Sequence, residues 1–214
     1  MENQDNQNFL KLSEAILSDN GWNEWGYTAL HWAVENGNLD IVKKLLKAPT
    51  IDINCTDNRN FTPLHLSCYE GHLDVTELLL ERGADVDAVD DNGRTPLFYA
   101  MMNYPEISSM LIKYGCDVNA IDECGYAPLH WAVESNDIDA VRELLESETI
   151  DVNLTDEKSG KNTALHLAVQ NPDCKEEIVQ CLVYKGANLN ALNENNKTPW
   201  NFADFIFTGS DVTY

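Results

Sequence analysis

Apolar residues recur along this chain in pairs of short helical patterns that are separated by polar turns. The clearest example is the stretch from 62 to 88, TPLHLSCYEGHLDVTELLLERGADVDA. Thr62 can cap the free amides of a first helix, Pro63 suits its first turn, and Gly71 ends it. Leucine and valine then recur at helical spacing in a second helix that stops at Gly83. The pattern predicts two antiparallel helices, followed by an extended segment and a turn.

The four residues that open this unit recur along the chain. At intervals of 34, 33, 32, 36 and 35 residues, the copies begin at Thr28, Thr62, Thr95, Ala127, Thr163 and Thr198. Every copy but the last is followed by a second helical pattern. Neither helix of a unit can bury its apolar face alone, so neighbouring units must share a core. The sequence therefore predicts one repetitive domain.

This period, together with the repeated T-P-L-H pattern, resembles the ankyrin repeat, and the resemblance covers about residues 22–208. It implies an all-α ankyrin-repeat solenoid of stacked helix-turn-helix units with projecting β-hairpin fingers, which is used to bind other proteins. We expect five full repeats and a partial one, near residues 22–54, 55–87, 88–119, 120–153, 154–190 and 191–208.

The two ends of the chain are expected to differ from the repeats. Residues 1–21 are predicted to be a disordered start and an N-terminal capping helix, and 209–214 a C-terminal tail. The last copy has an unusually apolar helix and no second one. Either its aromatic residues tuck against the fifth repeat, which would cover apolar surface, or the sequence is a truncated product.

Charge narrows the choice of partners. The chain has 14 lysines and arginines against 36 aspartates and glutamates, a formal net charge of −22. Nucleic acid and anionic membranes attract cationic surfaces, so we expect neither as a partner. A basic protein is the electrostatic expectation, although the charge could serve solubility alone. No apolar run reaches the roughly 20 residues that cross a bilayer, and the polar N-terminus is unlike a signal peptide, so we expect a cytoplasmic protein that could also be nuclear.

The sequence offers no catalytic or metal-binding motif. Its six cysteines are irregularly spaced without a C-x-x-C pair, which indicates neither a zinc site nor a disulfide framework. No nucleophile elbow, phosphate loop, dinucleotide fingerprint or zincin helix occurs. We therefore expect no enzyme, no cofactor and no metal site.

One histidine position is repeated in four of the copies, as His31, His65, His130 and His166. Stacked helices lie about 8–10 Å apart, which is too far for one ion to join these rings. The resemblance implies that each histidine instead ties a finger to the neighbouring repeat by hydrogen bonds.

Aromatic residues inside an acidic rim occupy the positions that an ankyrin stack would place on its fingers and on the exposed edge of its first helices. Such a surface suits protein binding, because a few buried anchors carry most of the affinity while charge steers the encounter. We expect a monomeric interaction module or adaptor that uses the concave face of repeats one to four. The candidate residues are Trp22, Trp25, Tyr27, Glu35, Phe61, Tyr69, Glu70, Arg94, Met102, Tyr126 and Glu134. Alternatively, the tryptophans cover the N-terminal edge, and Phe61 and Tyr126 pack between fingers.

Two other functions also fit the sequence. One is an acidic mask or chaperone for a basic client, in the manner of the acidic ankyrin inhibitors of Rel transcription factors. The other is a targeting fragment of a larger enzyme.

Three asparagines resemble the ankyrin sites used by the asparaginyl hydroxylase of the hypoxia pathway. Asn54, Asn119 and Asn153 each follow an acidic and an aliphatic residue, with a leucine eight residues earlier. The resemblance implies a modification that the protein receives and does not itself perform.

Overall fold

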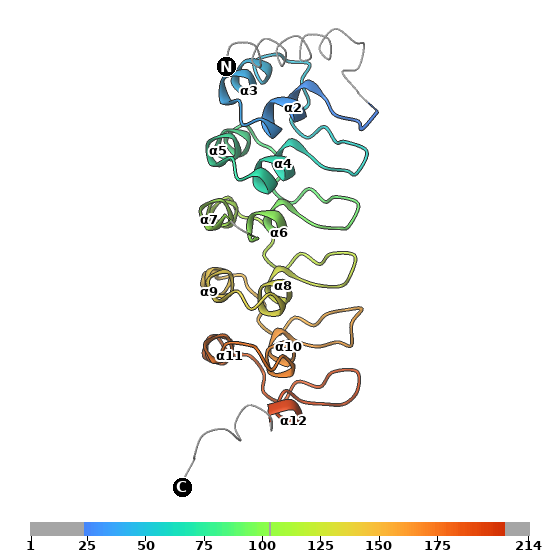
Figure 1. Cartoon of the computed structure of the whole chain (residues 1–214), viewed down its shortest axis with the longest axis vertical. Helices are drawn as coiled ribbons and strands as arrows, with labels where there is room; N and C mark the ends of the chain where they lie inside the picture. Colours follow the sequence, from blue (N-terminus) through green and yellow to red (C-terminus); the bar gives the residue numbers. More distant parts are fainter. Residues whose placement is uncertain (1–23, 103, 204–214) are drawn as a thin grey trace. The chain divides into compact units, whose positions relative to one another are not determined.

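The computed structural model describes residues 24–102 and 104–203 of the chain (Figure 1). The predicted capping helix, the C-terminal tail and the candidate residue Trp22 lie outside these ranges. The chain divides into two compact units, Met1–Cys116 and Asp117–Tyr214. We call them the first and the second unit and describe each by itself.

The described part of the first unit consists of three helix pairs. They are α2 (Ala29–Glu35) with α3 (Leu39–Leu45), α4 (Pro63–Glu70) with α5 (Leu73–Glu81), and α6 (Pro96–Ala100) with α7 (Pro105–Lys113). Helix α4 packs between α2 and α6, while α5 packs between α3 and α7. The fingers project on the side of α2, α4 and α6 (Figure 1), which we call the inner helices; α3, α5 and α7 are the outer helices.

The second unit repeats this arrangement. Its described elements are the inner helices α8 (Pro128–Glu134), α10 (Ala164–Gln170) and α12 (Trp200–Ala203), and the outer helices α9 (Ile138–Glu146) and α11 (Glu176–Tyr184). Helix α10 packs against α8 and α12, and α11 against α9. Throughout the described ranges the fingers are loops rather than strands, and the one isolated β-bridge joins Thr155 to Thr163. The expected all-α stack of helix-turn-helix repeats is confirmed.

The ends of α4 follow the sequence prediction. Thr62 Oγ1 accepts a hydrogen bond from the backbone N–H of His65 at 3.3 Å, and Pro63 occupies the first turn. Gly71 ends the helix in the left-handed conformation, with φ of 77°. The third repeat differs because Phe98 stands where four other copies have histidine. There the buried Thr95 Oγ1 has no hydrogen-bond partner.

A strip of leucines forms the shared core of each unit. In the first unit, Leu30, Leu64 and Leu97 of the inner helices are at most 1% exposed. In the second, Leu165 and Leu182 are buried to the same extent. Truncation of such a side chain to alanine typically costs about 2–5 kcal/mol, so this strip dominates the packing energy of each unit.

Each of the four repeated histidines ties its inner helix to the finger that follows it in the chain. Nδ1 of His65 accepts the backbone N–H of Thr62 at 3.2 Å, so the ring proton lies on Nε2, which donates to the carbonyl oxygen of Arg94 at 3.0 Å. His31 makes the same pair of bonds in the first unit, as do His130 and His166 in the second. Burial lowers the pKa of His31, His65 and His130, which favours this neutral form. The structural role implied by the resemblance is confirmed.

The turns between inner and outer helices contact one another from repeat to repeat. The His72 ring lies against Gly37 and donates from Nε2 to the carbonyl oxygen of Glu35 at 3.1 Å. The Tyr104 ring lies against Gly71 in the same way.

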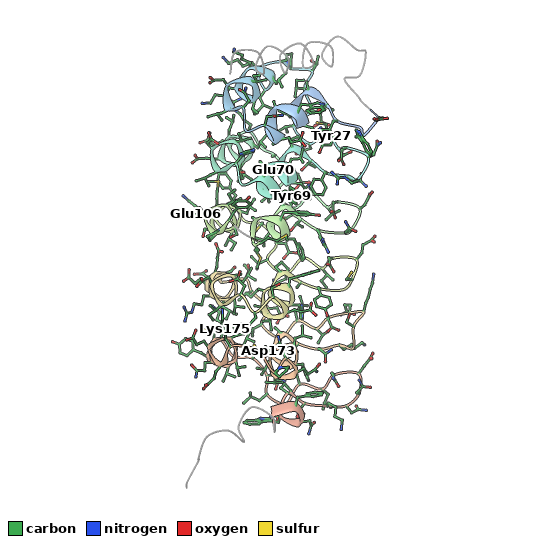
Figure 2. The ribbon with its side chains drawn as sticks, in the orientation of Figure 1. Tyr27, Tyr69, Glu70, Glu106, Asp173 and Lys175 are labelled. Atoms are coloured by element: carbon green, nitrogen blue, oxygen red, sulfur yellow. The ribbon has the colours of Figure 1, made fainter. Side chains whose placement is uncertain are left out.

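In the second unit the corresponding turn contact uses hydrogen bonds in place of a ring. Asn136 donates to the carbonyl oxygen of Asp173 at 2.8 Å and accepts the backbone N–H of Lys175 at 2.9 Å. Figure 2 shows Asp173 and Lys175 in the turn between α10 and α11.

Candidate protein-binding surface

Three apolar candidates of the first unit are exposed. Trp25, from the first finger, and Met102, from the turn after α6, are each 65% exposed. Tyr69, near the end of α4, is 53% exposed. Large side chains this open to solvent on a folded unit offer the apolar area that protein partners bury.

Phe61 does not share this exposure. It is 7% exposed, and its ring stacks on His65 with centroids 5.2 Å apart and meets the edge of Tyr99 at 4.9 Å. The guanidinium of Arg59 covers the ring, 4.9 Å from its centroid. Phe61 is therefore a packing residue, as in the alternative that the sequence left open, and its expected place on the exposed surface is wrong.

Two tyrosines border the inner helices α2 and α4 (Figure 2). Tyr27 is half-buried; its ring lies 5.4 Å from His31 and meets the edge of Trp32 at 5.8 Å. Tyr69 meets the edge of Tyr99 at 5.9 Å while most of its own surface stays open. Burial raises the pKa of Tyr27, and the charge of Glu35 raises it further.

Two carboxylates end these same helices. Glu35 is the last residue of α2 and Glu70 the last of α4, and neither helix has a basic residue in its last turn. Burial raises the pKa of Glu35, and the nearby charge of Glu70 adds to this rise. The charge of Arg59 acts in the opposite direction and lowers the pKa of Glu35, while the Arg59 guanidinium pairs with the buried Asp57 at 3.3 Å.

We call the exposed and half-buried candidates of the first unit the inner face. Its residues are Trp25, Tyr27, Glu35, Tyr69, Glu70 and Met102. Arg94 is partly buried at the third finger, where its backbone oxygen accepts the hydrogen bond from His65.

The last two candidates belong to the second unit. Tyr126 is half-buried, 5.8 Å from the ring of His130 and 5.9 Å from that of Trp131. Glu134 is exposed at the end of α8, in the position that Glu35 has in α2. Tyr126 thus combines partial packing with partial exposure.

The sequence analysis missed the buried carboxylates that shape the fingers. Asp57 Oδ1 accepts the backbone N–H groups of Arg59 and Phe61, both at 2.8 Å. Asp90 and Asp122 hold two backbone N–H groups of their own fingers in the same way. Each of the three lies five residues before the N-cap residue of the next inner helix, and this spacing is a signal that the sequence contains.

The asparagines proposed for hydroxylation join neighbouring repeats. Asn54 Oδ1 accepts the backbone N–H of Asp85 at 2.9 Å, and Asn153 Oδ1 that of Asn188 at 2.6 Å. Asn119 uses both ends of its amide: Oδ1 accepts from Asp151 and Nδ2 donates to the carbonyl oxygen of Thr149, each at 2.8 Å. The three side chains therefore contribute to the stacking of the repeats.

Within residues 24–102 and 104–203, no three His, Cys, Asp or Glu side chains gather closely enough to hold a metal ion. None of the helices in these ranges is both long and apolar enough to span a bilayer.

Comparison with protein families and curated proteins gives consistent matches. A family model described as ankyrin repeats, in three copies, matches residues 4–90, 44–122, 85–156 and 120–193. Protein phosphatase 1 regulatory subunit 27 of Homo sapiens is 42% identical over 82 residues, which are 38% of this chain and 53% of that protein. Tyrosine-protein kinase HTK16 of Hydra vulgaris is 43% identical over 72 residues, 33% of this chain and 10% of the kinase. The matched segments thus cover about half or less of these relatives.

Comparison with solved structures also finds an ankyrin repeat protein. The crystal structure of EF0377, an ankyrin repeat protein, is similar to this chain with a TM-score of 0.72 and 25% sequence identity. The match covers 82% of this chain and 89% of the other.

Proposed function

The chain belongs to the ankyrin-repeat family, a family of protein-interaction modules, and we propose that it is a non-catalytic adaptor that binds a partner protein through the inner face of its first unit. The observation that carries the proposal is the exposure of Trp25, Tyr69 and Met102. Aromatic and methionine side chains are enriched at protein interfaces, where a few of them carry most of the binding energy.

The chemistry of the inner face favours a basic partner. Glu35 and Glu70 border the exposed rings, and the whole chain has a net charge of −22. Opposite charges accelerate encounter and disfavour acidic competitors. We propose accordingly a monomeric, cytoplasmic protein, able to act in the nucleus too, whose partner is a basic protein and neither nucleic acid nor a membrane.

Two relatives illustrate how such a module can be used. One is named as a regulatory subunit of a phosphatase, and another is a tyrosine kinase of which the match covers 10%. A regulatory adaptor suits the first comparison, and a targeting segment of a larger enzyme suits the second. The exposed rings favour the adaptor over a mask that acts by charge alone, since a mask needs no aromatic anchors.

The test begins with partner capture. Crosslinking in native lysate and mass spectrometry would identify the partner, which is then purified for titration. The double variant Trp25→Ala/Met102→Ala is expected to weaken binding at least about thirtyfold, because a buried anchor contributes roughly 2 kcal/mol. Tyr184→Ala is the matched control, since Tyr184 lies on the outer helix α11 and is 94% exposed. Unchanged affinity of the double variant would contradict the proposal.

The dependence of binding on salt concentration distinguishes the proposed adaptor from the alternative, an acidic mask. Exposed charges are screened over about 8 Å at physiological ionic strength. For an aromatic anchor surface, the association rate slows with added salt while the equilibrium constant changes little. A steep loss of affinity with salt, together with normal binding by the Trp25→Ala/Met102→Ala variant, would establish the mask.

A further inference from the structure

The inner helix α6 begins without the hydrogen bonds that open the other inner helices. In α2, α4 and α10, the hydroxyl of the N-cap threonine accepts the backbone N–H of a histidine, and the histidine ring accepts the N-cap N–H. In α8 the N-cap residue is alanine, but the ring of His130 still accepts its N–H at 3.1 Å. In α6 the side chain of the N-cap Thr95 makes no cap bond, and Phe98 has no ring nitrogen that could accept the N–H. Of these five helices, α6 therefore has the most weakly capped N-terminus.

Burial increases the cost of the missing cap. Thr95 is 1% exposed, and within the described residues its Oγ1 has no hydrogen-bond partner. A hydroxyl in this position gives up its bonds to water on folding without gaining others. The helix is also short, because α6 has five residues whereas α2, α4, α8 and α10 have seven or eight. So short a helix adds few backbone hydrogen bonds to offset its unfavourable start.

The position of α6 and α7 limits the contacts that hold them in the first unit. They are the last helices of that unit, which ends at Cys116. Within it α6 packs against α4, and α7 against α5 (Figure 1). The ring of Tyr104 lies against Gly71, and the Tyr99 ring meets Phe61 at 4.9 Å. Inside the first unit, separation of α6 and α7 thus breaks contacts with one neighbouring repeat, whereas α4 has α2 and α6 on its two sides.

We propose that α6 and α7 open together in a local, reversible unfolding step while α4 and α5 remain folded. Folded proteins open in cooperative segments, and a segment with poor capping and few neighbours opens at a lower free energy than the whole. Met102 follows α6 directly in the turn and belongs to the inner face. Opening removes Met102 from that face, so a partner that contacts it binds the closed form alone and suppresses the opening. The opening is a property of the free chain, and only this coupling rests on the proposed function.

Hydrogen exchange of the free, full chain tests the opening. Backbone amides of α6 and α7, followed by peptide mass spectrometry, are expected to exchange at least about tenfold faster than those of α4 and α5. Their exchange should also depend less on urea, since a local opening exposes less surface than global unfolding. Alkylation of Cys116 by N-ethylmaleimide is an independent measure, because Cys116 is buried and should react through the same opening. Exchange of both helix pairs at one rate and with one urea dependence would overturn the proposal.

Two threonine variants test the cause of the opening. Thr95→Val removes a hydroxyl that has no partner and keeps the shape of the side chain, so the α6 amides should exchange no faster than in the parent. Thr62→Val is the matched control. It removes a hydroxyl that accepts the N–H of His65 at 3.3 Å, so the α4 amides should exchange about fivefold faster. Equal acceleration in the two variants would show that α6 is capped as well as α4, which would contradict the proposed weakness.

The opening and the proposed function can fail separately. If the exchange pattern is as expected but Trp25→Ala/Met102→Ala leaves partner binding unchanged, the opening stands and the inner face is not the binding surface. If that variant loses binding while α6 and α7 exchange like α4 and α5, the adaptor stands and the local opening is wrong.

Discussion

The hydroxyl of Tyr99, in inner helix α6, donates a hydrogen bond to Oδ2 of Asp90, at the base of the third finger, over 2.5 Å. Both residues are buried. Burial by itself would raise the pKa of Asp90, but this bond and those from Arg94 and Asn92 lower it overall. The pair therefore fixes the finger to the helix with a charge-assisted hydrogen bond.

Removal of that hydroxyl is the first prediction. Tyr99→Phe keeps the ring contacts with Phe61 and Tyr69 but leaves the buried carboxylate of Asp90 short of a donor. We expect the free energy of unfolding to fall by about 1.5–3 kcal/mol, measured by urea denaturation at neutral pH. Tyr184→Phe, at a 94% exposed position, should change it by less than about 0.5 kcal/mol. Equal effects of the two changes would show that the bond to Asp90 adds nothing.

Stability should depend on pH through the buried histidines. Burial lowers the pKa of His31, His65 and His130 below the unfolded value of about 6.5, so the unfolded chain binds protons more readily. Their stabilising contribution is complete above about pH 6.5 and decreases as the pH falls below it. Urea midpoints at pH 8 and pH 5.5 should therefore differ, with the lower value at pH 5.5.

A substitution identifies the source of that dependence. The double variant His31→Phe/His65→Phe removes two of the titrating rings. Phenylalanine is chosen because the third repeat has it at the equivalent position, Phe98. The double variant should be less stable at pH 8, since the bonds to two fingers are lost, and its stability should change less between the two pH values. An unchanged slope would exclude these histidines as its cause.

Substitutions at Gly71 and Gly83 can be compared to measure the contribution of one turn contact. Both have positive φ, 77° and 82°, but a Cβ at Gly71 would lie 2.2 Å from the Tyr104 ring, whereas nothing lies within 4 Å of one at Gly83. Gly83→Ala should cost about 1 kcal/mol from the backbone alone, and Gly71→Ala about 2–3 kcal/mol. Thermal unfolding of both variants measures the difference, and equal losses would show that Tyr104 moves aside freely.

Hydroxylation of the asparagines should require local opening. Since Asn119 makes hydrogen bonds from both ends of its amide, the asparaginyl hydroxylase is expected to add oxygen to peptides containing Asn54, Asn119 or Asn153 faster than to the folded chain. Mass spectrometry of both substrates after incubation measures this. No oxygen on any of the three peptides would contradict the proposed modification.

The fold could be predicted from the sequence because its signals are local and repeated. The N-cap Thr62, the turn at Gly71 and the leucine spacing are each visible within one unit. The exposure of Phe61 could not be predicted in that way, since it depends on Tyr99, which lies in the next repeat, and on the rotamer of Arg59. Equivalent sequence positions thus give a half-buried Tyr27 and a buried Phe61.

The electrostatics at the ends of the inner helices could likewise not be predicted from the sequence alone. The repeat pattern predicted Glu35 and Glu70 as surface candidates, and they are the last residues of α2 and α4. That pattern could not show that burial and the charge of Glu70 raise the pKa of Glu35, because both effects depend on how α2 and α4 pack. The fingers are the opposite case, because the five-residue interval before each N-cap residue could have identified Asp57, Asp90 and Asp122.

The turn contacts make the repeats of this chain specific to their neighbours. Gly37 accommodates the imidazole of His72, and Gly71 the larger ring of Tyr104, while Asn136 holds two backbone groups of the following turn. A duplicated or transplanted repeat would meet the wrong counterpart at one of its edges. Proteins related to this one should accordingly gain or lose a repeat together with the turn that contacts it. Variants in which the order of the repeats is changed should lose stability, and they should recover it when both residues of a turn contact are exchanged together.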